Sequence, residues 1–114
     1  MATPADIPSY QDLMWPTVEA LRKSGGSARI GEIAEVVIEA EGFTEEQQQV
    51  TRSPDDAMPM IDYQLAWARN YLKNIGAIEN SARGVWTLTD LGRTMTEDEI
   101  PDRVRAYKRE YSKR

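Results

Sequence analysis

Residues 60–75 carry the pattern that most constrains the fold of this chain. Apolar side chains recur along the segment at alternating spacings of four and three residues, and Gly76 follows it. Such spacing places the apolar positions within about 80° of arc on one side of a helix. These positions are Ile61, Leu65, Ala68, Leu72 and Ile75. We therefore predict a helix from Met60 to Ile75 that buries one face and exposes the other.

A β-hairpin is predicted directly after this helix. Residues 77–79 and 85–88 have strand-forming composition, and the turn-rich residues 80–84 connect them. Gly84 suits a position with positive φ in the connector. The helix and hairpin thus form one continuous predicted unit from Met60 to Leu88.

Shorter elements surround this unit. A helix is predicted from Ser9 to about Ser24, in which Pro16 either introduces a kink or marks the true first turn. The other predictions are a short strand at 28–30, a helix at 31–41, a short helix capped by Thr44 and ending near Val50, a loop at 51–59, a short helix at 89–95 and an amphipathic helix at 100–114.

The order of these elements predicts a mainly α fold with a small β-hairpin. It is the order of a winged helix-turn-helix: a three-helix core, a short strand, a two-stranded wing and a C-terminal helix. We expect residues 1–8 to form an irregular N-terminal arm, residues 9–96 the winged-helix domain, and residues 97–114 a basic amphipathic helix or the start of a linker.

The composition argues against catalysis. The chain has no cysteine and no histidine, which removes thiolate chemistry, the commonest general base and the commonest transition-metal ligand. Its adjacent acids point apart and are better explained as helix caps and solubilising charge. They are Glu45-Glu46, Asp55-Asp56 and Glu97-Asp98-Glu99. We expect no catalytic residue, metal, cofactor or small-molecule substrate.

The charge is distributed unevenly along the chain. Residues 1–62 contain 12 acids and 4 bases, whereas residues 63–114 contain 7 acids and 10 bases, within a net charge of −5. The half that holds the predicted helix and wing is therefore the basic half, as a polarised DNA-binding module requires. No apolar run is long enough to span a membrane, and no secretory signal is evident. We expect a cytoplasmic protein.

Two stretches resemble a known family. They are "SYQDLMWPTVEAL" (Ser9 to Leu21) and "WARNYLKNIGAIENSARGVWTLTDLGR" (Trp67 to Arg93). Together they are similar to the N-terminal domain of Mrr-type restriction proteins, a family that couples a winged-helix DNA-binding domain to a C-terminal nuclease. The resemblance implies a role in a restriction system that acts on foreign or modified DNA.

The chain departs from the expected family pattern at two points. Asp55 and Asp56 occupy a loop where we expect a glycine with basic residues, and they would repel phosphate. The nuclease would need an acid followed by an Asp/Glu/Gln-x-Lys pair to hold its metal ion. The residues two before the four lysines are Leu21, Tyr71, Ala106 and Tyr111. We therefore expect no nuclease activity from this chain.

The exposed face of the long helix and the wing supply the candidate DNA contacts. Asn can pair with adenine, and Arg or Lys with guanine or phosphate. The candidates are Tyr63, Arg69, Asn70, Lys73, Asn74 and Arg83, with Arg29 as a weaker candidate. Trp67, Tyr71 and Trp86 are predicted to be packing residues of the scaffold. Duplex DNA is thus the predicted partner.

Two questions remain open at the level of the sequence. A protein-interaction or dimerisation winged helix, or a stand-alone transcriptional regulator, would have the same fold, and the acidic first half favours the interaction module. The C-terminal helix carries an apolar stripe of Val104, Tyr107 and Tyr111 amid basic residues. It could clamp DNA, pack on its own domain, form a homodimer, or begin a linker.

Overall fold

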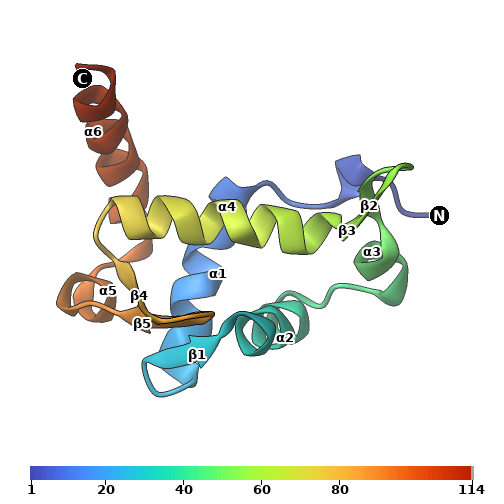
Figure 1. Cartoon of the computed structure of the whole chain (residues 1–114), viewed down its shortest axis with the longest axis horizontal. Helices are drawn as coiled ribbons and strands as arrows, with labels where there is room; N and C mark the ends of the chain where they lie inside the picture. Colours follow the sequence, from blue (N-terminus) through green and yellow to red (C-terminus); the bar gives the residue numbers. More distant parts are fainter. Residues whose placement is uncertain (114) are drawn as a thin grey trace.

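The computed structural model describes residues 1–113 and is mainly helical with two small antiparallel sheets (Figure 1). The predicted class, mainly α with a small β-hairpin, is confirmed. The elements in chain order are η1 (Pro4–Asp6), α1 (Tyr10–Lys23), β1 (Ser27–Arg29), α2 (Ile30–Glu41), α3 (Glu45–Gln49), β2 (Thr51–Ser53), β3 (Asp56–Pro59), α4 (Met60–Asn74), β4 (Ile78–Ala82), β5 (Val85–Leu88), α5 (Asp90–Thr94), η2 (Glu97–Glu99) and α6 (Ile100–Ser112). Arg114, the last residue of the predicted C-terminal helix, lies outside the described residues.

The core forms where α1 packs against α4. Four of the five periodic positions of α4 are fully buried, and Ile75 is half-buried at the C-terminal cap. They meet Leu13, Val18 and Leu21 of α1, none of which is exposed to solvent. α1 begins at Tyr10 and continues through Pro16. Pro16 therefore lies well inside the helix and does not mark its first turn. The predicted buried face of α4 is therefore confirmed.

The β4–β5 hairpin forms a three-stranded sheet with β1, in the order β1-β5-β4. The predicted five-residue connector at 80–84 is wrong, since Ala82 pairs with Val85 and only Arg83 and Gly84 make the turn. A bulge between Asn80 and Ala82 accommodates the extra length. The Asn80 amide donates to the carbonyls of Ala82 and Val85, both at 2.8 Å, and so extends β4 beyond the predicted strand.

Residues 51–59, predicted to be a loop, form a second hairpin from β2 and β3. Pro54 and Asp55 make the turn, and side-chain hydrogen bonds stabilise both arms. Thr51 Oγ1 donates to the Ser53 carbonyl, and Asp56 Oδ1 accepts from the Met58 amide. This hairpin could not be predicted from the sequence because its strands are short and Pro59 ends the second one.

Two smaller predictions also change. The first strand covers Ser27–Arg29, so Ile30 begins α2 instead of ending the strand. The N-terminal arm is not wholly irregular, because it contains η1 and places Ile7, 7% exposed, in the core. The cap of α3 is as predicted, with Thr44 Oγ1 accepting from the Gln47 amide.

Helix α5 holds the base of the β4–β5 hairpin. Thr89 caps this helix and its hydroxyl also donates to the carbonyl of Gly76 at 2.5 Å, next to β4. The Arg22 guanidinium donates to the carbonyls of Gly92 and Met95, at 3.0 and 2.8 Å, and so joins the end of α1 to α5. A side chain at Gly92 would place its Cβ 2.0 Å from the Ala77 carbonyl oxygen. The close approach of α5 to β4 therefore requires glycine.

Helix α6 rises beside the C-terminal end of α4 and projects away from the rest of the molecule (Figure 1). Its apolar stripe is buried at the base and exposed at the tip. Ile100 lies in the core, Val104 and Tyr107 are half-buried, and Tyr111 is 68% exposed. Among residues 1–113, no helix combines the length and apolar character needed to cross a membrane.

We predict that Gly92→Ala lowers the free energy of unfolding by about 2–3 kcal/mol, in the upper part of the usual range for overpacking. The clash is with backbone, so a rotation of a side chain cannot relieve it. The matched control is Gly31→Ala in α2, where a Cβ meets nothing within 4 Å. Gly31→Ala should be neutral or stabilise by up to about 1 kcal/mol. Urea unfolding measures both, and equal stabilities would contradict the close approach.

Candidate nucleic-acid interface

The outward face of α4 presents amide and ammonium groups to solvent. Asn70, Lys73 and Asn74 are exposed, opposite the buried face of the helix. Within residues 1–113, Lys73 makes no ion pair, and neither Asn side chain makes a hydrogen bond. These three groups are therefore available to bind a ligand that supplies hydrogen-bond partners.

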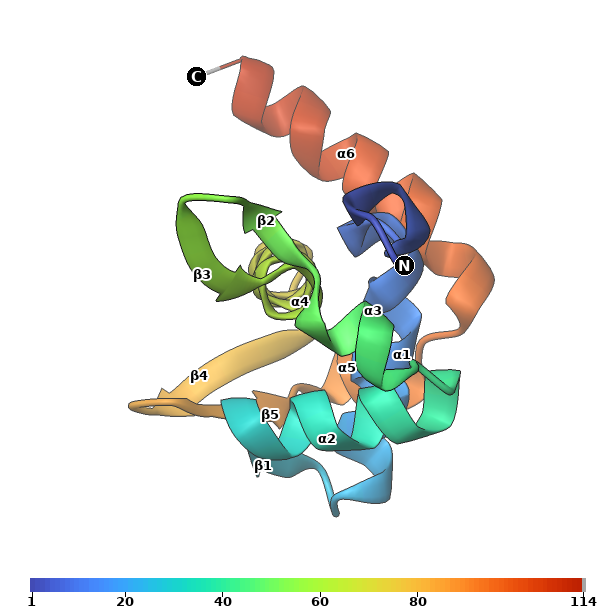
Figure 2. The same ribbon diagram turned by 90° about the vertical axis from the view of Figure 1, so that its right-hand side faces the viewer.

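Two hairpins project to the same side of α4, one on each flank (Figure 2). The β2–β3 hairpin lies at the N-terminal end of the helix, and the β4–β5 hairpin follows its C-terminal end along the chain. The exposed residues of α4 thus lie along a helix that has a projecting hairpin on either side.

Tyr63 was predicted to lie on the exposed face of the helix, but it is not freely exposed, because the β2–β3 hairpin covers one face of its ring. The Arg52 guanidinium lies 4.7 Å from the ring centroid, and its Nη1 is 3.6 Å from an oxygen of Asp56. This arrangement fastens the hairpin to α4. The Tyr63 side chain is half-buried and lines a hollow beneath the hairpin.

Arg69 lies on the inner flank of α4 and is only 9% exposed. Its Nε has no hydrogen-bond partner among the described residues. Burial lowers the pKa of Arg69, and the nearby negative charge of Asp62 opposes this shift in part. Of the six predicted contact residues, Arg69 is therefore the one whose side chain is largely withdrawn from solvent.

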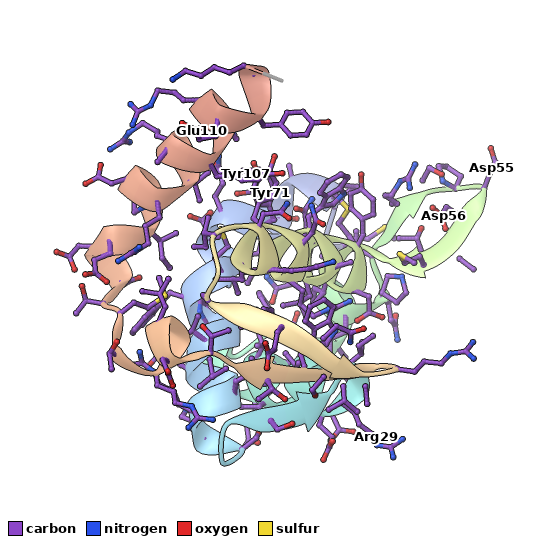
Figure 3. The ribbon with its side chains drawn as sticks, turned by 60° about the vertical axis from the view of Figure 1, so that its left-hand side comes forward. Arg29, Asp55, Asp56, Tyr71, Tyr107 and Glu110 are labelled. Atoms are coloured by element: carbon purple, nitrogen blue, oxygen red, sulfur yellow. The ribbon has the colours of Figure 1, made fainter. Side chains whose placement is uncertain are left out.

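Arg83 lies at the tip of the β4–β5 hairpin and is exposed. Gly84 beside it has φ +72°, a left-handed conformation that glycine adopts without a clash from a Cβ atom. The Gly84 carbonyl accepts from the Ile30 amide at 3.1 Å, which ties the turn to the start of α2. Arg29 lies on the neighbouring strand β1 with its side chain in solvent (Figure 3). A cation is therefore presented on a backbone that is held at several points.

The β2–β3 hairpin carries the opposite charge. Asp55 lies at its tip with an exposed side chain, and Asp56 lies beside it (Figure 3). The flanks of α4 therefore differ, with carboxylates near its N-terminal end and the cation of Arg83 on the other hairpin.

The sequence did not predict a cluster of aromatic rings that joins α1, α4 and α6. Tyr10 and Tyr71 stack with their ring centroids 4.7 Å apart, and Tyr107 meets Tyr71 edge to face at 6.3 Å (Figure 3). Its surroundings raise the pKa of Tyr71 above its ordinary value. The largest cause is the interaction with the Tyr10 hydroxyl, and the next is partial burial of the Tyr71 side chain. Tyr71 is a packing residue as predicted, whereas Trp67 is 42% exposed and that prediction is wrong. One sequence signal could have predicted this cluster: each of the two helices carries a pair of aromatic residues four positions apart, Trp67 with Tyr71 and Tyr107 with Tyr111.

The cluster also bears on the C-terminal helix. Because Tyr107 packs on Tyr71 of the same chain, part of the α6 stripe is used within its own domain. Lys108 Nζ lies 5.4 Å from the Tyr71 ring centroid and adds to the same contact. Among residues 1–113 there is no group of three or more His, Cys, Asp or Glu side chains that could hold a metal ion.

Comparison with known proteins identifies a family. A family model described as the Mrr N-terminal domain matches residues 10–98, which is most of the chain. No curated protein and no solved structure matches.

We predict that Arg69→Met changes the free energy of unfolding by less than about 1 kcal/mol. Methionine retains the apolar stem, and a buried cation without a full set of partners adds little stability. Leu72→Ala, one turn further along, is the control and should cost about 2–5 kcal/mol. A loss of more than about 3 kcal/mol in Arg69→Met would show that Arg69 is a paired buried charge. Urea unfolding monitored by circular dichroism gives both values.

Proposed function

Because the chain belongs to the Mrr N-terminal domain family, which associates it with Mrr-type restriction systems, we propose that it is a winged-helix module that binds duplex DNA. It would supply DNA recognition to such a system and have no nuclease activity of its own. In this proposal α4 is the recognition helix and the β4–β5 hairpin is the wing.

The observation that carries this proposal is the set of unpartnered polar groups on α4. The carboxamides of Asn70 and Asn74 each offer a donor and an acceptor side by side, the pattern that pairs with the major-groove edge of adenine. Lys73 lies on the same face and suits guanine or phosphate. All three side chains are exposed.

The path of the backbone supports the winged-helix assignment. The helices α1, α2, α3 and α4 precede a hairpin that forms one sheet with the short strand β1, and the long helix α4 leads directly into that hairpin. Arg83 at the hairpin tip can then reach a phosphate or the minor groove beside the site of α4. Tyr63, held beneath Arg52, would contribute from the N-terminal flank of the helix. Arg69, being buried, would act by supporting α4.

A protein-binding module is the second candidate, and one observation favours it. Met58 and Trp67 are exposed by 46% and 42% and line, with Tyr63, a hollow of about 480 Å³ between the β2–β3 hairpin and α4. Exposed apolar side chains beside one another are typical of interaction surfaces. A homodimer through the α6 stripe belongs to this class. Failure to bind random-sequence duplex DNA at low salt would favour this candidate.

We predict that Lys73→Ala and Arg83→Ala each weaken duplex binding roughly eightfold at 0.1 M salt. One lost phosphate contact removes one released counterion, which also lowers the slope of log affinity against log salt by about 1. Fluorescence anisotropy with a labelled 20-base-pair duplex measures both quantities.

Lys23→Ala is the matched control for these two substitutions. Lys23 is an exposed cation at the far end of α1, and its loss should leave the affinity within a factor of two. If all three variants bind as the wild type does, the interface on α4 and the hairpin is refuted.

We also predict that Asp55→Asn strengthens duplex binding about twofold at low salt. A unit charge about 10 Å from a phosphate in water contributes roughly 0.4 kcal/mol of repulsion, and salt screens it. Glu19→Gln on the exposed face of α1 is the charge-matched control and should have no effect. An Asp55→Asn gain that persists unchanged at 0.5 M salt would contradict an electrostatic origin.

A further inference from the structure

A groove of about 400 Å³ lies between α4 and α6, beside the proposed recognition face. One wall consists of Trp67, Asn70 and Asn74 of α4, and the other of Lys108, Tyr111 and Ser112 of α6. Tyr71 and Tyr107, in edge-to-face contact, join the two helices and form its floor (Figure 3). The packing of the core and the capping of the helices do not require such a groove.

The rings of the two walls have faces that no other ring covers. Trp67 lies 6.4 Å from Tyr71 at an interplanar angle of 39°, and Tyr111 lies 6.0 Å from Tyr107 at 35°. These tilted contacts are too open for face-to-face stacking, unlike that of Tyr10 on Tyr71, at 4.7 Å and 9°. Trp67 and Tyr111 are also 42% and 68% exposed. Each wall thus offers an aromatic surface to a flat ligand.

The polar groups of the groove suit a nucleotide. Two carboxamides without partners lie on the α4 wall, and the ammonium of Lys108 lies over the floor. Among residues 1–113, no carboxylate lines the groove, although the chain as a whole carries a net charge of −5. Stacking surfaces, amides that can read a base edge and a cation for phosphate are the chemistry by which proteins hold single-stranded nucleic acid.

We propose that the groove between α4 and α6 binds an unpaired segment of DNA, with a base stacked on Tyr111, the more exposed of the two wall rings. The proposal extends the proposed function, because Asn70 and Asn74 belong both to the groove and to the face that would read the duplex. An unpaired end or flap beside the bound duplex would then enter the groove directly from α4. α6 would then serve as one wall of a nucleic-acid site. Of the roles that the sequence left open for this helix, the proposal therefore selects contact with DNA.

The test is the binding of a fluorescein-labelled (dT)12 strand by the full chain at low salt. We expect binding with quenching of tryptophan fluorescence, and we expect Tyr111→Ala to weaken it at least fivefold, the lower end of the usual effect of one base–aromatic stack. Tyr111→Phe keeps the ring and should restore binding. Tyr111 is exposed near the end of α6, so these variants leave the core intact.

Two comparisons make the result decisive. An abasic 12-mer carries the same phosphates without bases, and it should bind at least fivefold more weakly than (dT)12; equal binding would reduce the groove to charge attraction and overturn the proposal. Tyr111→Ala should leave the affinity for a blunt duplex unchanged, whereas Arg83→Ala should weaken duplex binding and leave (dT)12 binding unchanged.

The two proposals can therefore fail separately. Duplex binding that depends on Arg83, with no effect of Tyr111→Ala on (dT)12, refutes the groove alone. Binding of (dT)12 that depends on Tyr111, with no binding of duplex DNA, refutes the duplex-binding function alone. If neither DNA binds, both proposals are overturned in favour of a protein-binding module.

Discussion

The packing of α1 against α4 is the contact on which the rest of the structure depends. It is the most extensive contact between two elements, and it completely buries leucine and isoleucine side chains of both helices, among them Leu13, Leu65 and Leu72. A polar contact fixes the position of α1 along α4, since Gln64 Oε1 accepts a hydrogen bond from the Tyr10 backbone amide at 2.8 Å where α1 begins. Once one face of α4 is fixed in this way, the opposite face has to meet solvent. The exposure of Asn70, Lys73 and Asn74 follows from the core and needs no separate cause.

The C-terminal half of the domain extends this core to the β4–β5 hairpin. α5 packs at the base of the hairpin through Gly92, and Arg22 of α1 holds two carbonyls of the α5 segment. The turn at the tip is held by Asn80 and by the amide of Ile30. Arg83 is therefore presented from a backbone connected to α1, α2 and α5, so its reach from α4 is set by the fold. Interfaces built on such rigid supports lose little entropy on binding.

The surface around α4 has two chemically distinct flanks. Towards the β2–β3 hairpin it is acidic and apolar, with Asp55, Met58 and Tyr63, whereas towards α6 it is aromatic with a cation from Lys108. Arg52 holds the first flank in place by lying over Tyr63 and pairing with Asp56. The single α4 helix thus contributes to the recognition face, to the hollow under the hairpin and to the groove beside α6. Its outward face carries most of the chain's candidate chemistry.

The local features of this protein follow from short-range patterns in its sequence. The periodicity of Ile61, Leu65, Ala68 and Leu72 specified the buried face of α4. The Thr caps specified where short helices begin, and the glycines specified where helices end, because these signals act within one or two turns of backbone. The resemblance in Trp67 to Arg93 also identified the family. The hairpin at 51–59 was not predicted because its strands are short, Pro59 lies in the second one, and no alternation of apolar residues marks either strand.

Packing between distant segments sets which polar and aromatic side chains are exposed and can bind a ligand. Arg69 and Asn70 are neighbours in sequence, yet one is buried and the other exposed, since the edge of the buried face falls between them. Tyr71 and Tyr107 are 36 positions apart, and only the direction of α6 after η2 brings their rings into contact. Trp67 and Tyr111 thereby come to line one groove from opposite walls. Long-range packing sets such distances, and no spacing within one helix encodes them.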